Sequence, residues 1–168
     1  GPTGLIEKGR ENLLLQSNQF DNGWFNVSST ETSGQTGYDG SSDAWLLEAT
    51  ASGGRLGRSI SIASGVYTSS IYAKAGSVDY LILKVEGSTT ASIWYDLANG
   101  VVGSKQGSRI DTNIQSVGNG WYRCSVTTNQ SFTFFIVSPA PTDGNTTSSN
   151  GDNIYIQDAQ LEIGLAAT

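Results

Sequence analysis

Apolar and polar residues alternate along short segments of this chain, and clusters of turn-forming residues separate the segments. A period of two is the pattern of a β-strand with one buried face, and helical periodicity is weak throughout. The alternation predicts strands at Ala44–Thr50, Gly57–Ile62, Val66–Lys74, Asp79–Glu86, Thr90–Leu97, Ile110–Ser116, Gly120–Thr127, Ser131–Ser138 and Asn153–Ile163. Short strands at this spacing predict an all-β fold, a two-sheet antiparallel β-sandwich of the jelly-roll type.

The connections between these strands are rich in Gly, Ser, Asn, Asp and Pro. Asn99-Gly100 predicts a tight hairpin, because a primed turn needs positive φ at two successive residues. Two longer connections of low complexity, Ser28–Ser42 and Thr142–Gly151, either rim a binding site or serve only as solvated loops.

Chain length and composition suit one domain over residues 1–168, with 1–11 as a lead-in and Gly1-Pro2 either a cleavage scar or native chain. Hydrophobic residues make up 37% of the chain, enough for a sizeable core. We expect a fragment of a longer protein. No apolar run is long enough for a transmembrane helix, so membrane insertion is not expected.

The charged and reactive residues exclude several classes of function. The chain has no His, so a His-based triad or metal site is impossible, and one Cys, Cys124, rules out an intrachain disulfide. A net charge of −6 argues against nucleic-acid binding. Carboxylates are the remaining acid–base groups, and no pair has a spacing that fixes both across a cleft. We therefore do not expect an enzyme, with a polysaccharide lyase or hydrolase as the remote alternative.

Alternation also sorts the central strands into inward and outward sets. Leu81, Leu83, Val85, Ile93 and Tyr95 belong to the inward set. The outward set combines aromatic and charged side chains, namely Trp94, Tyr80, Lys84, Asp96, Tyr72, Lys74, Arg123 and Trp121.

Aromatic rings beside hydrogen-bonding groups suit a sugar, whose C–H face stacks on a ring while its hydroxyls bond the polar neighbours. The outward set thus predicts a glycan site with Trp94 and Tyr80 as the stacking platform. Two alternatives stay open. In the first, a loop or a neighbouring subunit covers the aromatic rings of the outward set. In the second, Arg123 stacks on Trp121 as a cation–π pair instead of bonding a sugar.

Five blocks, in this order, carry a family resemblance. They are Gly4–Ser17 (GLIEKGRENLLLQS) with Phe20, Asp21 and Trp24; Tyr72–Gly76 (YAKAG); Tyr95–Gly100 (YDLANG); Gly118–Val126 (GNGWYRCSV); and Ala159–Glu162 (AQLE) with Gly164, Ala167 and Thr168. Together they resemble the carbohydrate-binding-module-like jelly-roll domain of phage tail-fibre and head-fibre proteins, although Glu11 stands where Thr is usual.

The resemblance implies a non-catalytic domain that binds a host-surface glycan or polysaccharide. It further implies an extracellular place on the virion, on a fibre or the capsid surface, and a homotrimer in the full-length protein. The alternative is a structural fibre-assembly or capsid-decoration domain with no sugar ligand. Trp121, Tyr122 and Arg123 match a motif shared by members with different ligands, which favours a structural role for them. Trp94 lies outside the matched blocks.

The chain is more distantly similar to the xylan- and glucan-binding jelly-roll modules of polysaccharide hydrolases, which often hold a structural calcium ion. That resemblance implies one calcium ion bound by Asp21, Glu48 and Asp158. The chain departs from those modules at Gln157, which stands where the second of two terminal Asp residues would be.

Overall fold

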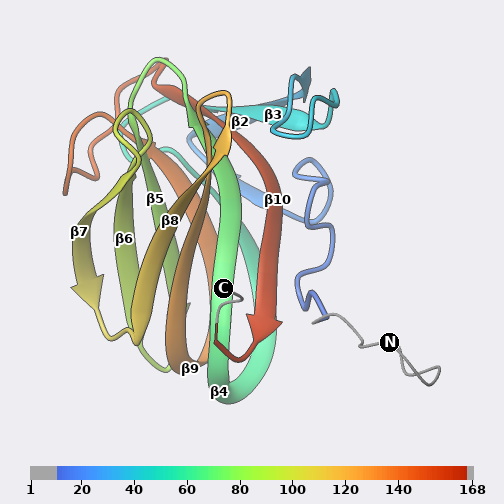
Figure 1. Cartoon of the computed structure of the whole chain (residues 1–168), viewed down its shortest axis with the longest axis vertical. Helices are drawn as coiled ribbons and strands as arrows, with labels where there is room; N and C mark the ends of the chain where they lie inside the picture. Colours follow the sequence, from blue (N-terminus) through green and yellow to red (C-terminus); the bar gives the residue numbers. More distant parts are fainter. Residues whose placement is uncertain (1–10, 166–168) are drawn as a thin grey trace.

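The computed structural model describes residues 11–165, and the regular structure in that range is entirely β (Figure 1). The strands are β1 (Phe25–Val27), β2 (Ser29–Gln35), β3 (Ala44–Ala49), β4 (Arg55–Ala75), β5 (Tyr80–Gly87), β6 (Thr90–Asp96), β7 (Val101–Gly107), β8 (Asp111–Gly118), β9 (Trp121–Ala140) and β10 (Asn153–Ile163). Residues 1–10 of the predicted lead-in at 1–11, including Gly1-Pro2, lie outside the described residues, as do the matches at Ala167 and Thr168. Within 11–165, no helix could span a membrane.

The two longest strands, β4 and β9, organise the molecule. They pair antiparallel from Leu56–Val137 at one end to Lys74–Trp121 at the other, side by side in Figure 1. The register shifts between Ser59 and Gly65, where β-bulges interrupt the pairing. A bulge bends its strand and increases the local twist. Each long strand therefore contributes one half to each of two sheets.

The pairings define two six-stranded antiparallel sheets that share β4 and β9. In the first sheet the order is β2-β3-β10-β4-β9-β8, using the C-terminal half of β4 and the N-terminal half of β9. In the second sheet the order is β1-β4-β9-β5-β6-β7, using the other halves. This arrangement confirms the predicted all-β antiparallel sandwich and agrees with a jelly roll.

The core lies between the two sheets and contains the residues that alternation sorted inward. Leu81, Leu83 and Ile93 of the second sheet are fully buried, as is Cys124 of the first. The Tyr95 hydroxyl, on the second sheet, donates a 2.7 Å hydrogen bond across the core to the carbonyl of Ser125 in the first sheet. This bond satisfies the one polar atom of a fully buried ring.

The strand boundaries differ from the prediction at β4 and β9, because each of these long strands was predicted as two separate short strands. Segments 57–62 and 66–74 belong to β4, and segments 120–127 and 131–138 belong to β9, because the intervening residues form bends rather than loops. Strands β1, β2 and β7 were not predicted. All three are edge strands with mostly exposed or half-buried residues, so they lack the apolar alternation that marks a buried face. The supposed loop Ser28–Ser42 thus contains a strand.

The hairpin predicted at Asn99-Gly100 joins β6 to β7, but its turn is not a primed one. Gly100 has a φ of 69°, whereas Asn99 is not among the residues with positive φ. The Asp96 carboxylate closes the turn instead, because its Oδ1 accepts 3.0 Å hydrogen bonds from the backbone N–H groups of Ala98 and Asn99.

Candidate functional site: a groove on the second sheet

The outward face of the second sheet is hollowed into a groove with a volume of about 650 Å³. Its lining comes from six strands and two loops. The lining residues are Phe25, Gly53, Arg55, Ile82, Lys84, Glu86, Ser92, Trp94, Gln106, Phe134, Ile136, Ser138 and Thr146.

Strand pairing sets the floor of the groove. One row of paired residues crosses the sheet from β1 to β7, and it consists of Phe25, Gly57, Ile136, Lys84, Ser92 and Gln106. The flanking rows contribute Phe134 paired with Glu86 on one side, and Ile82 paired with Ser138 and Trp94 on the other. Because alternate residues of a strand share a face, these rows all point away from the core.

Aromatic rings form one wall of the groove. The rings of Phe25 and Phe134 meet edge to face, with centroids 5.9 Å apart. The Phe25 ring lies directly over Gly57, where a Cβ atom would collide with it. Gly57 therefore lets the ring approach the sheet. Both Phe side chains are half-buried, so part of each ring faces the groove.

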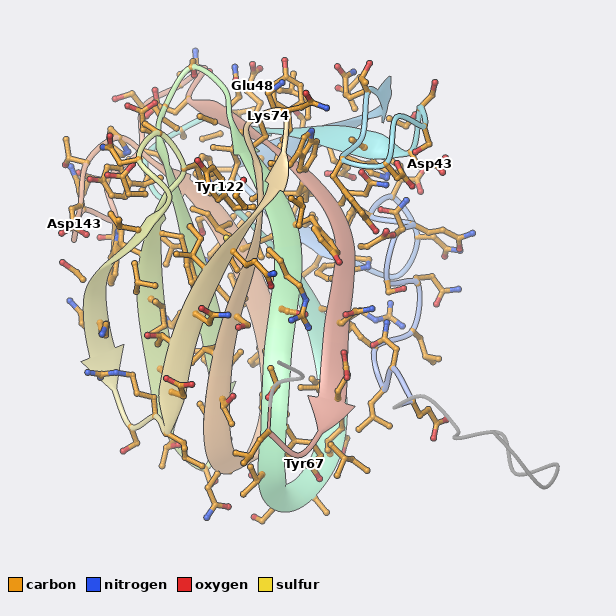
Figure 2. The ribbon with its side chains drawn as sticks, viewed as in Figure 1. Asp43, Glu48, Tyr67, Lys74, Tyr122 and Asp143 are labelled. Carbon is orange, nitrogen blue, oxygen red and sulfur yellow. The ribbon has the colours of Figure 1, made fainter. Side chains whose placement is uncertain are left out.

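The opposite wall belongs to the loop between β9 and β10. The Asp143 carboxylate accepts a 2.8 Å hydrogen bond from the backbone N–H of Ser104, which ties this loop to β7. The Ser148 hydroxyl accepts one of 3.1 Å from the N–H of Gly53, which ties it to the loop between β3 and β4. Figure 2 shows Asp143 at the edge of the molecule that carries β7. Two anchored ends hold the loop over the groove.

Three charged side chains line the groove. Lys84 Nζ lies 3.2 Å from a carboxylate oxygen of Glu86, two residues along the same face of β5. Arg55 is exposed, and its Nη1 donates a 3.2 Å hydrogen bond to the carbonyl of Gly53. The groove therefore has two cations and one anion, with Ser92, Gln106, Ser138 and Thr146 as neutral hydrogen-bonding groups.

The prediction that Trp94 offers an open stacking platform is wrong. Trp94 is on the outward face of the second sheet, as predicted, but the β9–β10 loop covers it and leaves its side chain 1% exposed. It packs with Ile82 and Ala140 in a small apolar cluster, and only its edge borders the groove. The loop alternative for this ring is the one that the structure supports.

Tyr80 and Asp96 stand beside the groove rather than in it. Tyr80 is half-buried against the Trp94 cluster, and its hydroxyl donates a 3.4 Å hydrogen bond to Asp96. Asp96 is buried. Burial by itself raises the pKa of Asp96, but hydrogen bonds from Asn99 and Ala98 outweigh that effect and lower it. Since its oxygens are occupied within the turn, Asp96 is not placed to orient sugar hydroxyls.

The other four predicted contacts lie on the first sheet, which faces the opposite side of the sandwich. They are Tyr72, Lys74, Trp121 and Arg123. Alternation put them on outward faces correctly, but the bend in β4 and β9 separates those faces from Lys84 and the groove. The single platform that combined all eight residues is therefore wrong.

The loop between β2 and β3 packs against the two aromatic rings of this second set. The ring of Tyr38 stacks on Tyr72 with centroids 3.8 Å apart, and it contacts Trp121 edge to face. Trp121 is 1% exposed. Arg123 hydrogen-bonds Ser70 and pairs with Glu162 at 3.7 Å, so the structure shows no stack of Arg123 on Trp121.

The three carboxylates that the resemblance implied as calcium ligands are not brought together. Glu48 pairs with Asn153 near the start of β10, whereas Asp158 lies beyond Ile156 at the far end of β3. Asp43 immediately precedes β3 and lies near Asp158, whose pKa its charge helps to raise. Figure 2 shows Asp43 well apart from Glu48, which is near the other end of β3. Over residues 11–165 no group of three acidic or thiol side chains could hold a metal ion. The calcium ion stays a prediction that these residues do not fit.

The most informative site residues were missed by the sequence reasoning. Phe134 follows from alternation, since Phe135 and Val137 point inward and their neighbours must point outward. Arg55, Phe25 and Gln106 lie on strand ends or edge strands, where no local pattern marks them.

The groove is suited to binding rather than to acid–base catalysis. Glycoside hydrolysis generally needs two carboxyl groups that flank the scissile bond. Among the described residues, Glu86 is the one carboxylate that lines the groove, and it is paired with Lys84. An elongated polar floor beside aromatic rings can hold a chain of sugar residues.

No protein-family model matches the chain, and no curated protein matches it. Its fold is similar to that of TmCBM61, a carbohydrate-binding module solved in complex with beta-1,4-galactotriose. The two chains are 16% identical, the match covers 92% of this chain and 99% of that one, and the TM-score is 0.48. At this level the likeness concerns the fold and leaves the ligand of this chain open.

Proposed function

We propose that the chain is a non-catalytic glycan-binding domain that holds a polysaccharide in the groove of the second sheet. The observation that carries this proposal is the combination of an aromatic wall, Phe25 and Phe134, with a floor of hydrogen-bonding groups. The rings would take the C–H faces of the sugars, and Lys84, Ser92 and Gln106 would bond their hydroxyls.

Such a groove would bind weakly. It offers two half-buried Phe rings rather than an open Trp, and its polar groups exchange water for sugar hydroxyls at little net gain. We expect a dissociation constant between about 10 µM and 1 mM, which corresponds to roughly 7 to 4 kcal/mol of binding free energy. Several copies held on one particle would then increase the avidity.

The test is binding to a glycan array, followed by calorimetric titration of each polysaccharide that responds. Phe134→Ala should weaken binding about tenfold, because it removes the ring that borders the groove from β9. Tyr72→Ala is the matched control, since it removes an aromatic ring of similar size from the opposite face. Equal binding by wild type and Phe134→Ala, or no binding to any glycan, would overturn the proposal.

We further propose that the domain is displayed on a virion fibre or capsid, where a homotrimer would supply the several copies. The terminal and central motif resemblances support this placement. Light scattering on the full-length protein would test the trimer, and immunogold labelling of purified virions would test the location. A monomeric full-length protein would remove the avidity argument.

The structural alternative, fibre assembly or capsid decoration without a sugar ligand, required Tyr80 and Trp94 to be buried against a neighbouring subunit. The β9–β10 loop of the same chain covers Trp94 instead, and Tyr80 is half-buried against the Trp94 cluster. The two rings on which that alternative rested therefore need no neighbouring subunit to bury them.

A further inference from the structure

We propose that the groove selects acidic polysaccharides, with Arg55 and Lys84 recognising carboxylate groups on the sugar chain. This inference rests on the proposed glycan-binding function. Its basis is a local reversal of charge. The chain has a net charge of −6, yet the side chains that line the groove sum to +1, from Arg55, Lys84 and Glu86.

Arg55 is the group best placed to bind an anion. It is the first residue of β4, beside the aromatic wall, and its side chain is exposed. Its one hydrogen bond goes to the backbone carbonyl of Gly53, and no carboxylate within residues 11–165 forms an ion pair with it. Most of its guanidinium donors are therefore available for a two-pronged contact with a carboxylate.

Lys84 occupies the middle of the floor, between Ile136 and Ser92. Its ammonium group has three donors, and its ion pair with Glu86 uses one of them. The pair also holds the ammonium over the floor, because Glu86 is on the same strand and the same face. A second acidic group of the ligand can bind there without separating the pair.

The two cations are spaced along the groove rather than clustered. Arg55 is on β4 and Lys84 on β5, with β9 between them, so their backbones are separated laterally by roughly 10 Å, or two strand spacings. A chain that carries acidic groups on successive or alternate sugars can contact both cations, which points to a polymer as the ligand.

The experiment compares acidic polysaccharides with their carboxyl-reduced forms, which keep the same backbone without the charge. Alginate, polygalacturonate and hyaluronate serve as probes, measured by affinity electrophoresis and calorimetry at low and high NaCl. We expect at least one acidic polymer to bind about tenfold more tightly than its reduced form. That preference should shrink as salt rises, because the cations are exposed.

Arg55→Gln should abolish most of the preference, because it should lower affinity for the acidic polymer about tenfold and affinity for the reduced form by a clearly smaller factor. Arg109→Gln is the matched control, because Arg109 is also exposed and hydrogen-bonds the carbonyl two residues before it, at 2.9 Å, but lies outside the groove. Lys84→Gln should act in the same direction as Arg55→Gln.

The outcomes separate this inference from the function beneath it. Equal binding of acidic and reduced polymers, or equal effects of Arg55→Gln and Arg109→Gln, would overturn the acidic preference and leave glycan binding standing. If Phe134→Ala also had no effect on any polymer, the proposed function would fail as well.

Discussion

The indole Nε1 of Trp94 donates a 3.0 Å hydrogen bond to the backbone carbonyl of Asn145. The two residues are 51 positions apart, and their bond fixes the middle of the β9–β10 loop over the outward face of β6. Trp94 stabilises the loop, because its only hydrogen-bond donor is satisfied there and its ring is buried beneath the loop. The loop in turn forms one wall of the groove.

Substitution of Trp94 should therefore reduce stability. Trp94→Phe keeps most of the ring but removes the donor to Asn145, so we expect a loss of about 1 kcal/mol in the free energy of unfolding. Trp94→Ala leaves a cavity and should cost about 3–5 kcal/mol. Urea denaturation measures both. A Trp94→Ala protein as stable as wild type would show that the ring does not hold the loop.

The approach of Phe25 to Gly57 should be essential for the aromatic wall. Gly57→Ala would place a Cβ atom against the ring, displace it and weaken glycan binding about as much as Phe25→Ala, roughly three- to tenfold. Calorimetry on both single variants and the double variant forms the test. Since both changes remove the same ring position, their effects should not add. Additive effects would show that Gly57 acts independently of Phe25.

The turn after β6 should depend on the Asp96 carboxylate. Asp96→Ala removes acceptors for the backbone N–H groups of Ala98 and Asn99 and should lower the free energy of unfolding by about 1–3 kcal/mol. Asp96→Asn retains one carbonyl acceptor and should cost less. Thermal denaturation at pH 7 compares the two. Equal losses would indicate that burial, rather than these hydrogen bonds, matters at Asp96.

Asp158 should make stability depend on pH. Burial raises the pKa of Asp158 above its ordinary value of 3.8, although a hydrogen bond from the Tyr38 hydroxyl partly opposes that effect. The folded state therefore binds the proton more tightly than the unfolded chain. The contribution of Asp158 is fully present below pH 3.8 and is lost as the pH rises through the raised folded-state value.

Asp158→Asn should remove this slope, and at pH 7 it should be as stable as wild type or more stable. Asn can still accept the Tyr38 hydrogen bond, and it tolerates the φ of 49° at this bulge. Asp158→Ala loses the acceptor and should be less stable by about 1–2 kcal/mol. Urea denaturation from pH 3 to 7 measures both variants. An unchanged pH slope in Asp158→Asn would contradict this account.

Much of the fold follows from the sequence because the side chains of a strand alternate between its faces. Leu81, Leu83 and Ile93 were assigned to the core correctly on this basis alone. The edge strands β2 and β7 could not be predicted in this way, since their exposed residues satisfy no apolar pattern. The continuity of β4 through Ser64 and Gly65 was also hidden, because turn-forming residues at a bend look like those of a loop.

The candidate site was only partly predictable. Lys84 borders the groove as expected, and Trp94 borders it by one edge. Tyr72 and Arg123 were assigned to an outward face correctly, yet that face belongs to the other sheet. Alternation gives the side of a strand on which a residue lies, but it does not say which sheet that strand joins.

The amino-acid sequence by itself determined which side chains of each strand point inward, because that depends on nearest neighbours along the chain. Only the tertiary structure decided which outward side chains remain open. Trp94 is covered by residues near Asn145, and Trp121 lies beneath Tyr38, contacts between positions far apart in the chain. The groove likewise exists because β1, β4 and β9 meet β5 and β6 in space, and long-range pairing of this kind leaves no periodic signal in a single strand.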